Sequence, residues 1–134
     1  GLTVKGNIHG KDGIYAASLL VEMMAVSGKK LSEIAEDIRK EYGEIHMEER
    51  AYRFTAEEKE RIHKTLMMDQ ALPEIPFEVD HISYMDGCKV YLKNAGWVST
   101  RFSGTEPLLR IFCEMETEHE AVMICEIFEK FLGL

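Results

Sequence analysis

Residues 101–107 read Arg-Phe-Ser-Gly-Thr-Glu-Pro and place one guanidinium, two hydroxyls and a glycine within five consecutive positions. These groups suit a phosphate dianion, because a guanidinium forms charge-assisted hydrogen bonds and the hydroxyls add further donors. A tight turn that contains glycine also frees backbone amides, and successive amides can form an anion-binding nest. The residue types and their spacing therefore indicate a phosphate-binding loop.

Two apolar segments of β-strand character, residues 97–102 and 108–115, flank this loop. Symmetric pairing about the loop would set Arg101 opposite Arg110 on one face of the hairpin. Two opposed guanidiniums repel each other unless an anion lies between them, so Arg110 is included in the predicted phosphate site. The same register would place these pairs on the apolar face: Phe102 with Leu109, Thr100 with Ile111 and Val98 with Cys113.

The loop also permits a simpler interpretation. Ser-Gly-Thr is common in turns, and Arg101 and Arg110 could point into solvent or pair with a nearby carboxylate. The carboxylates within reach along the sequence are Glu106, Glu114 and Glu116. On residue chemistry alone, the phosphate site and the polar hairpin loop both remain open.

Other chemistry is weakly indicated. His46, Glu48 and Glu49 lie close together, but no second cluster has the spacing of metal ligands, so we interpret them as solvated side chains. Nothing resembles the strand-turn-helix site of a serine nucleophile. From these residues we expect no metal ligand in this chain, while a Ser-His-Asp triad stays open on sequence order alone.

Helical periodicity and end signals predict the elements that position the loop. We expect helices over residues 12–26, 31–42, 55–68 and 118–132, the third of them beginning at the capping-box pattern Thr55-Ala56-Glu57-Glu58. A mixed segment at 44–54 can hold a strand, and short β-type runs follow between residues 79 and 115. Strand, helix, three strands and helix make a compact α+β unit, with residues 1–43 outside it.

Composition limits the class of protein. The 134 residues are 46% apolar and 30% charged, which suits one folded domain, or a small domain with an appended piece, and excludes a disordered chain. The net charge of −8 disfavours nucleic acid as a partner, because such binding depends on Lys and Arg at phosphates. We also expect no membrane partner, because no apolar run approaches the roughly 20 residues of a membrane span.

The cysteines indicate the compartment. Cys88, Cys113 and Cys125 are odd in number and form no C-x-x-C pair. We expect them to be buried apolar side chains of a protein in the reducing cytoplasm.

Three ordered motifs resemble one known family. The segment RFSGTEPLLRIF at 101–112 is similar to the phosphate-binding loop R-x-S-G-T-E-P-x-x-R in the C-terminal domain of the α-D-phosphohexomutases, the phosphoglucomutase and phosphomannomutase superfamily. Residues 10–23 resemble the K-D-G-I-x-A-A helix that closes the third domain of that family. Asp86-Gly87 and Gly96-Trp97-Val98 resemble the lead-in to the loop. The match extends over essentially the whole chain.

The resemblance implies a division of the chain and a fold. Residues 1–44 would be the incomplete C-terminal tail of the third, α/β domain. Residues 45–134 would be the C-terminal phosphate-binding domain, an α+β unit with a four-stranded antiparallel sheet and two helices on one side, similar to the TATA-box-binding protein. The chain would then be a C-terminal fragment of a longer enzyme.

The resemblance also implies a reaction. Phosphohexomutases move phosphate reversibly between the 1- and 6-positions of a hexose, through a phosphoserine and a bisphosphorylated sugar. Arg101, Ser103, Gly104 and Thr105 would contact the phosphate that is not transferred, with Arg110 in a supporting role. The catalytic serine and the aspartates that hold Mg²⁺ belong to domains missing from this chain, so we expect the fragment to be inactive alone.

Alternatives to an enzyme fragment come from other classes. One is a free-standing phosphosugar-binding module with a regulatory role. Another is an RNA-binding domain, which the charge and the scarcity of exposed aromatic residues in the strands disfavour. The apolar stripe of the helix at 12–26 needs a partner, which we expect to be the second helix, the α+β unit or a second copy in a dimer.

Overall fold

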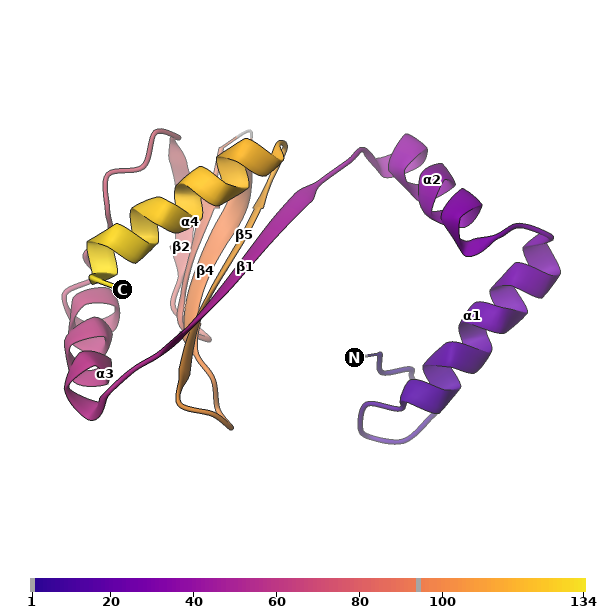
Figure 1. Ribbon diagram of the computed structural model, residues 1–134, viewed down its shortest axis with the longest axis horizontal. Helices are drawn as coiled ribbons and strands as arrows, with labels where there is room; N and C mark the ends of the chain where they lie inside the picture. The colour runs from indigo at the N-terminus through magenta and orange to yellow at the C-terminus, as the bar shows by residue number, and fades with distance from the viewer. Residues whose placement is uncertain (1, 94) are drawn as a thin grey trace. The chain divides into compact units, whose positions relative to one another are not determined.

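The computed structural model describes residues 2–93 and 95–134, and the chain forms two compact units, Gly1–Glu44 and Ile45–Leu134. The first unit contains helices α1 (Gly13–Ser27) and α2 (Leu31–Tyr42), and the second contains the sheet and the remaining helices (Figure 1). The candidate loop lies in the second unit, so its setting can be described from that unit alone.

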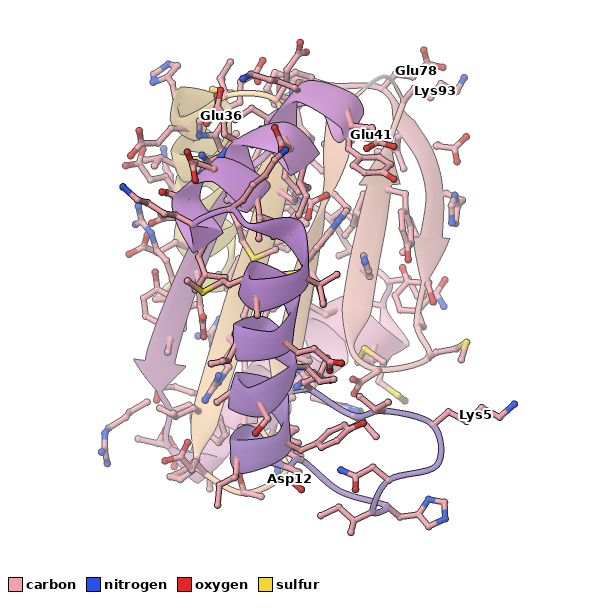
Figure 2. The ribbon with its side chains drawn as sticks, turned by 90° about the vertical axis from the view of Figure 1, so that its right-hand side faces the viewer. Lys5, Asp12, Glu36, Glu41, Glu78 and Lys93 are labelled. Atoms are coloured by element: carbon pink, nitrogen blue, oxygen red, sulfur yellow. The ribbon has the colours of Figure 1, made fainter. Side chains whose placement is uncertain are left out.

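The two helices of the first unit begin and end as their sequence predicts. The carboxylate of Asp12, labelled at the start of α1 in Figure 2, accepts a hydrogen bond of 2.9 Å from the Tyr15 amide. Gly28 ends α1 in the left-handed region, and Gly43 follows α2. Every residue of both helices is described and none is buried, and Ile14 on the apolar stripe of α1 is 85% exposed.

A five-stranded antiparallel sheet forms the second unit. Its strands lie in the order β1-β5-β4-β3-β2, with the candidate loop joining the two strands β4 and β5. The bounds are β1 His46–Arg53, β2 Val79–Ser83, β3 Cys88–Leu92, β4 Ala95–Phe102 and β5 Leu108–Met115. In Figure 1 the loop projects beyond one end of the sheet.

The expectation of four strands is therefore wrong. The mixed segment at 44–54 supplies β1, and all eight residues of this strand pair with β5 from His46–Met115 to Arg53–Leu108. Alternate residues of β1 are half-buried, although many of them are polar, because they face a helix on one side of the sheet. Hydrogen bonding to β5 along its whole length stabilises β1 as a strand, although the apolar alternation of this segment is weak.

Two helical elements cover one face of the sheet, as expected. Helix α3 (Ala56–His63) continues as a π-helical segment, Lys64–Met68, and α4 (Glu118–Leu132) crosses the same face. Thr55 and Thr117 cap α3 and α4 with capping boxes. The core between helices and sheet includes Ile62, Leu66, Val90, Val98, Leu109, Ile111, Ile124 and Phe128. Within this unit no described helix covers the other face, which stays open.

The register of the β4–β5 hairpin confirms the predicted pairing. Arg101 lies opposite Arg110, while Phe102 pairs with Leu109, Thr100 with Ile111 and Val98 with Cys113. The last three pairs point toward the helices, and all of their members except Phe102 are buried. The two arginines therefore share the open face.

Two glycines permit close approach of neighbouring backbones around this hairpin. A Cβ atom at Gly96 would lie 1.6 Å from the carbonyl oxygen of Glu114 on β5. A Cβ atom at Gly87, whose φ is +84°, would lie 2.4 Å from the carbonyl oxygen of Thr100 on β4. The glycines of the D-G and G-W motifs are thus required by the packing of the sheet.

Replacing Gly96 with alanine should lower the free energy of unfolding by about 3 kcal/mol, because β4 and β5 must move apart to admit the methyl group. In the described part of the chain, a Cβ atom at Gly104 would meet nothing within 4 Å, so Gly104→Ala is the control and should change stability by less than about 0.5 kcal/mol. Urea denaturation measures both. Equal effects of the two variants would contradict the close approach at Gly96.

The three cysteines are fully buried, as the sequence predicts, and burial raises the pKa of the Cys88 thiol to about 11.

Native protein at pH 8 should therefore react with a disulfide reagent such as dithionitrobenzoate only as fast as it unfolds, because the thiolate is the reactive form. Since the folded pKa lies above the ordinary value of 9.0, this thiol's contribution to stability is lost as pH rises toward 11. A rapid burst of native labelling would contradict the burial.

Candidate anion-binding site

The site is built around two arginines that face each other from adjacent strands. Arg101 is exposed near the end of β4, and Arg110 is half-buried on β5. Antiparallel pairing brings opposed side chains close together, so like charges at these positions destabilise the hairpin unless they are compensated.

The positive charge of each arginine is compensated by ion pairs with nearby carboxylates. The Arg101 guanidinium donates to the carboxylate of Asp86 at 2.5 Å, and Asp86 belongs to the turn between β2 and β3. The Arg110 guanidinium donates to Glu49 of β1 at 3.2 Å and lies 3.6 Å from Glu106 of the loop. Across the sheet, the charges therefore follow the order minus, plus, plus, minus, with both cations in the middle.

The simpler interpretation as a polar hairpin loop is confirmed in part, because Arg110 pairs with Glu106. These ion pairs are nevertheless exposed: the side chains of Arg101 and Asp86 are 45% and 76% accessible. Exposed pairs contribute about 0–1 kcal/mol, whereas hydrogen bonds to a charged group contribute about 1.5–3 kcal/mol. A phosphate with two or more such contacts can compete with them.

Loop 103–107 adds hydrogen-bond donors beside the arginines. Its start is fixed by the Ser103 amide, which donates to the Leu108 carbonyl at 2.7 Å, and the Thr105 amide donates to the Ser103 hydroxyl over a long 3.4 Å. Among the described residues no carbonyl accepts from the Gly104 amide. Ser103 is half-buried, while Gly104 and Thr105 are exposed. The loop thus holds hydroxyls and an amide free to meet an anion.

Arg110 carries a further unused donor. Its Nε atom is buried and has no hydrogen-bond partner among the described residues. A buried donor without an acceptor costs free energy, so a partner supplied by a ligand would be favourable. The arrangement as a whole can bind a small anion with two or more negative charges.

Comparison with known proteins identifies the domains that contain this geometry. A family model described as "Phosphoglucomutase/phosphomannomutase, C-terminal domain" matches residues 46–130, and "Phosphoglucomutase/phosphomannomutase, alpha/beta/alpha domain III" matches residues 1–42. The chain belongs to the phosphoglucomutase/phosphomannomutase family. Its residues match two domains of that family, as its motifs indicate.

Curated relatives agree with this family assignment. The chain is 32% identical to the phosphoglucomutase/phosphomannomutase of Thermococcus kodakarensis over 128 residues, which cover 93% of this chain and 25% of the relative. It is 32% identical to a probable phosphoglucosamine mutase of Methanothermobacter thermautotrophicus, covering 86% and 24% of the two chains. A phosphoglucosamine mutase of Geobacillus kaustophilus is 31% identical, covering 80% and 20%. The chain spans between a fifth and a quarter of the length of these relatives.

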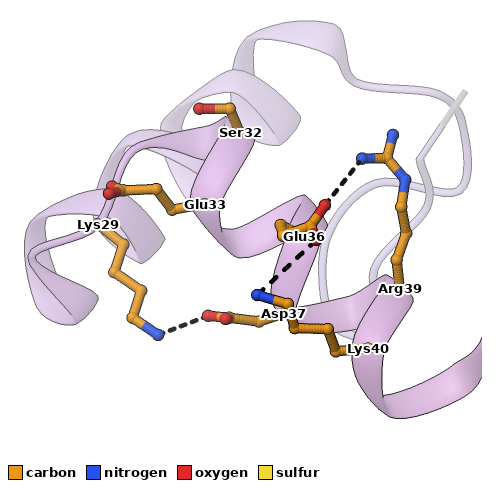
Figure 3. Close-up of a pocket in the computed structure, with 7 residues that line it drawn as sticks. All are labelled: Lys29, Ser32, Glu33, Glu36, Asp37, Arg39 and Lys40. Carbon is orange, nitrogen blue, oxygen red and sulfur yellow. Dashed lines mark hydrogen bonds and ion pairs between the residues drawn. The ribbon is translucent and has the colours of Figure 1, made fainter.

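Other features of the chain offer less chemistry. A hollow on α2 is lined by charged residues that already pair with one another, including Lys29 with Asp37 and Lys40 with Glu36 (Figure 3). In residues 2–93 and 95–134, His, Cys, Asp and Glu side chains form no group of three that could hold a metal ion. No helix in the described part has the length and apolar character needed to cross a membrane.

Of the three carboxylates of the site, the sequence indicates Glu106 but not Asp86 or Glu49. Asp86 was noted only as part of a motif, and Glu49 only among weak metal candidates, because each lies far along the chain from the arginine that it contacts. The signal available was electrostatic, since two opposed cations need anions nearby. Which carboxylates supply them depends on the strand order.

Replacing Asp86 with asparagine should strengthen binding of inorganic phosphate by about threefold, because one negative charge beside Arg101 is removed. Titration followed by the amide NMR signals of residues 103–105, at low ionic strength, measures this change. Glu126→Gln on α4 removes one exposed carboxylate from the opposite face and should leave the affinity unchanged. Weaker binding by the Asp86 variant would instead show that Asp86 positions Arg101.

Proposed function

We propose that this chain holds the phosphate that is not being transferred in a phosphohexomutase. Arg101, Ser103, Gly104 and Thr105 contact that phosphate, and Arg110 supports Arg101 from the facing strand. The observation that carries the proposal is the pairing of two arginines across β4 and β5, next to a loop with free donors. An anion between these groups would satisfy the cations and the buried Nε of Arg110.

In this proposal, the two units of the chain correspond to two different domains of the longer protein. Residues 1–44 are the incomplete C-terminal tail of the third, α/β domain, and residues 45–134 are the phosphate-binding domain. The boundary of the two compact units and the two family matches support this division. The exposed apolar side chains of α1 suit a helix that completes its packing elsewhere, for which a dimer of the fragment is a second possibility.

The whole protein would interconvert hexose 1- and 6-phosphates in the cytoplasm. A phosphoserine and a bisphosphorylated hexose would carry the phosphate, and Mg²⁺ would be held by another domain, as the family resemblance implies. This chain would then bind and orient the substrate without supplying a nucleophile or a base. We expect the fragment to be inactive by itself. The names of the relatives favour glucose, mannose or glucosamine phosphate as the substrate class.

Replacing Arg101 with alanine should weaken binding of inorganic phosphate to the 134-residue chain by about tenfold or more, because a charge-assisted contact contributes about 1.5–3 kcal/mol. The same NMR titration of residues 103–105 measures the affinity in the millimolar range. Arg39→Ala, which removes an exposed arginine of α2, is the matched control and should have no effect.

Equal affinities of wild type and the Arg101 variant would contradict the phosphate site. Retained affinity in the variant, together with signal changes elsewhere in the chain, would point to a different anion site. Thermal unfolding of each variant checks that the fold is intact.

A further inference from the structure

A cavity of about 220 Å³ lies on the helical side of the sheet, behind the β4–β5 hairpin. It is distinct from a larger cavity on the open face, which adjoins Arg101 and belongs to the candidate anion site. An engineered cavity of about 150 Å³ with apolar walls binds benzene, so the volume behind the hairpin is enough for a compact ligand. Its apolar walls come from the π-helical segment and from the two strands of the hairpin, and they are Leu66, Met67, Phe102 and Leu109.

Thr100 contributes an unsatisfied hydroxyl to the lining of this cavity. The residue is 1% exposed, and its side chain points toward the helices. In residues 2–93 and 95–134 no group hydrogen-bonds its Oγ1 atom. Buried polar groups normally have a partner, because an unsatisfied one costs free energy. A ligand that carries a hydroxyl group would supply this partner.

The helical wall of the cavity has an unusual backbone. The Asp69 amide donates to the Lys64 carbonyl at 2.9 Å, which makes the end of this helix a wide π-helical turn. Gln70 follows with a φ of +49°, a left-handed conformation that residues other than glycine seldom adopt. Single π-helical turns within helices occur frequently at functional sites. The backbone therefore singles out the same place as the unsatisfied hydroxyl.

The two sides of the cavity differ in rigidity. The Phe102 ring is fixed by an edge-to-face contact with Phe54, whose ring centroid lies 5.2 Å away. Met67 is half-buried and unbranched, and such a side chain adapts to irregular spaces. A shift of Met67 would admit a ligand to the Thr100 hydroxyl beside the fixed aromatic wall.

Charge excludes an ionic ligand from this cavity. Its two charged lining residues, Arg101 and Asp86, already form an ion pair with each other. His63 also lines the cavity and is exposed to solvent. An ion placed among the apolar walls would be an uncompensated buried charge, which is costly. The cavity therefore suits an uncharged molecule.

We propose that this cavity binds a small uncharged molecule of the phenol class, with one apolar ring and one hydroxyl group. The ring packs against Phe102 and Leu109, and the hydroxyl hydrogen-bonds with Oγ1 of Thr100. A volume below the roughly 300 Å³ of typical drug-sized sites limits the ligand to a single ring. The site needs no phosphate group on its ligand, so it does not depend on the proposed function.

Two matched probes, 4-fluorophenol and fluorobenzene, differ by the hydroxyl group, and fluorine NMR follows the binding of each to the 134-residue chain. We expect 4-fluorophenol to bind saturably and about fivefold more tightly than fluorobenzene, because it alone can hydrogen-bond with Thr100. Thr100→Val removes the hydroxyl with little change of shape, and it should weaken 4-fluorophenol by about fivefold without affecting fluorobenzene. Thr3→Val makes the same change at an exposed position of the first unit and is the control.

A second variant tests the position of the site without removing the hydroxyl. Met67→Trp places a large ring at the adaptable wall and should abolish the binding of both probes. Thermal unfolding checks both variants, and Thr100→Val should unfold at the same temperature as the wild type or higher, because it removes an unsatisfied polar group.

Three results would overturn the proposal. They are the absence of saturable binding, equal affinities of the wild-type chain for the two probes, and binding that both variants leave unchanged. The last result would place the ligand elsewhere, for example on the exposed apolar stripe of α1. The probe comparison on the wild-type chain and the Met67 variant remain decisive even if Thr100→Val fails to fold. Because no phosphate is used, none of these results bears on the proposed function.

Discussion

The opposition of Arg101 and Arg110 across adjacent strands is the interaction on which the site depends. Like charges facing each other in an antiparallel pair are unfavourable, and the sheet compensates them with carboxylates on both sides. This compensation requires the observed strand order, because β1 brings Glu49 beside β5 and the turn before β3 brings Asp86 beside β4. Strand β1, which the sequence indicated within residues 44–54, is therefore part of the electrostatic setting of the loop.

Two glycines permit the close backbone contacts that hold the charged residues around the loop in place. At Gly96 the backbone of β5 approaches so closely that no side chain fits, and at Gly87 the turn that carries Asp86 lies against Thr100 and Arg101. A positive φ at Gly87 adds a second reason for glycine there. These contacts give the D-G and G-W motifs a structural role, since they hold a carboxylate and a guanidinium at bonding distance.

The two faces of the sheet differ in composition and in role. The helical face buries the apolar core and the three cysteines, and the open face presents charges, hydroxyls and aromatic rings. The net charge of −8 does not prevent anion binding on that face, because salt screens exposed charges beyond about 8–10 Å. In the proposed site, the affinity for phosphate would be decided by groups within hydrogen-bonding distance. Aromatic residues on this face were underestimated from the sequence, since Tyr91, Trp97 and Phe112 gather only when three strands pair.

Local signals in the sequence were sufficient for the helices, their caps, the hairpin and the pairing of Arg101 with Arg110. Each of these depends on residues close together in the chain, through periodicity, capping boxes and the symmetry of a short loop. Motifs in the same segments were enough to indicate the family. Only the tertiary structure decided that residues 46–53 form an edge strand, which carboxylates meet the arginines, and which side chains line the open cavity. The physical reason is that these contacts join residues distant in the chain, and the strand order that brings them together is set by packing of the whole sheet against α3 and α4.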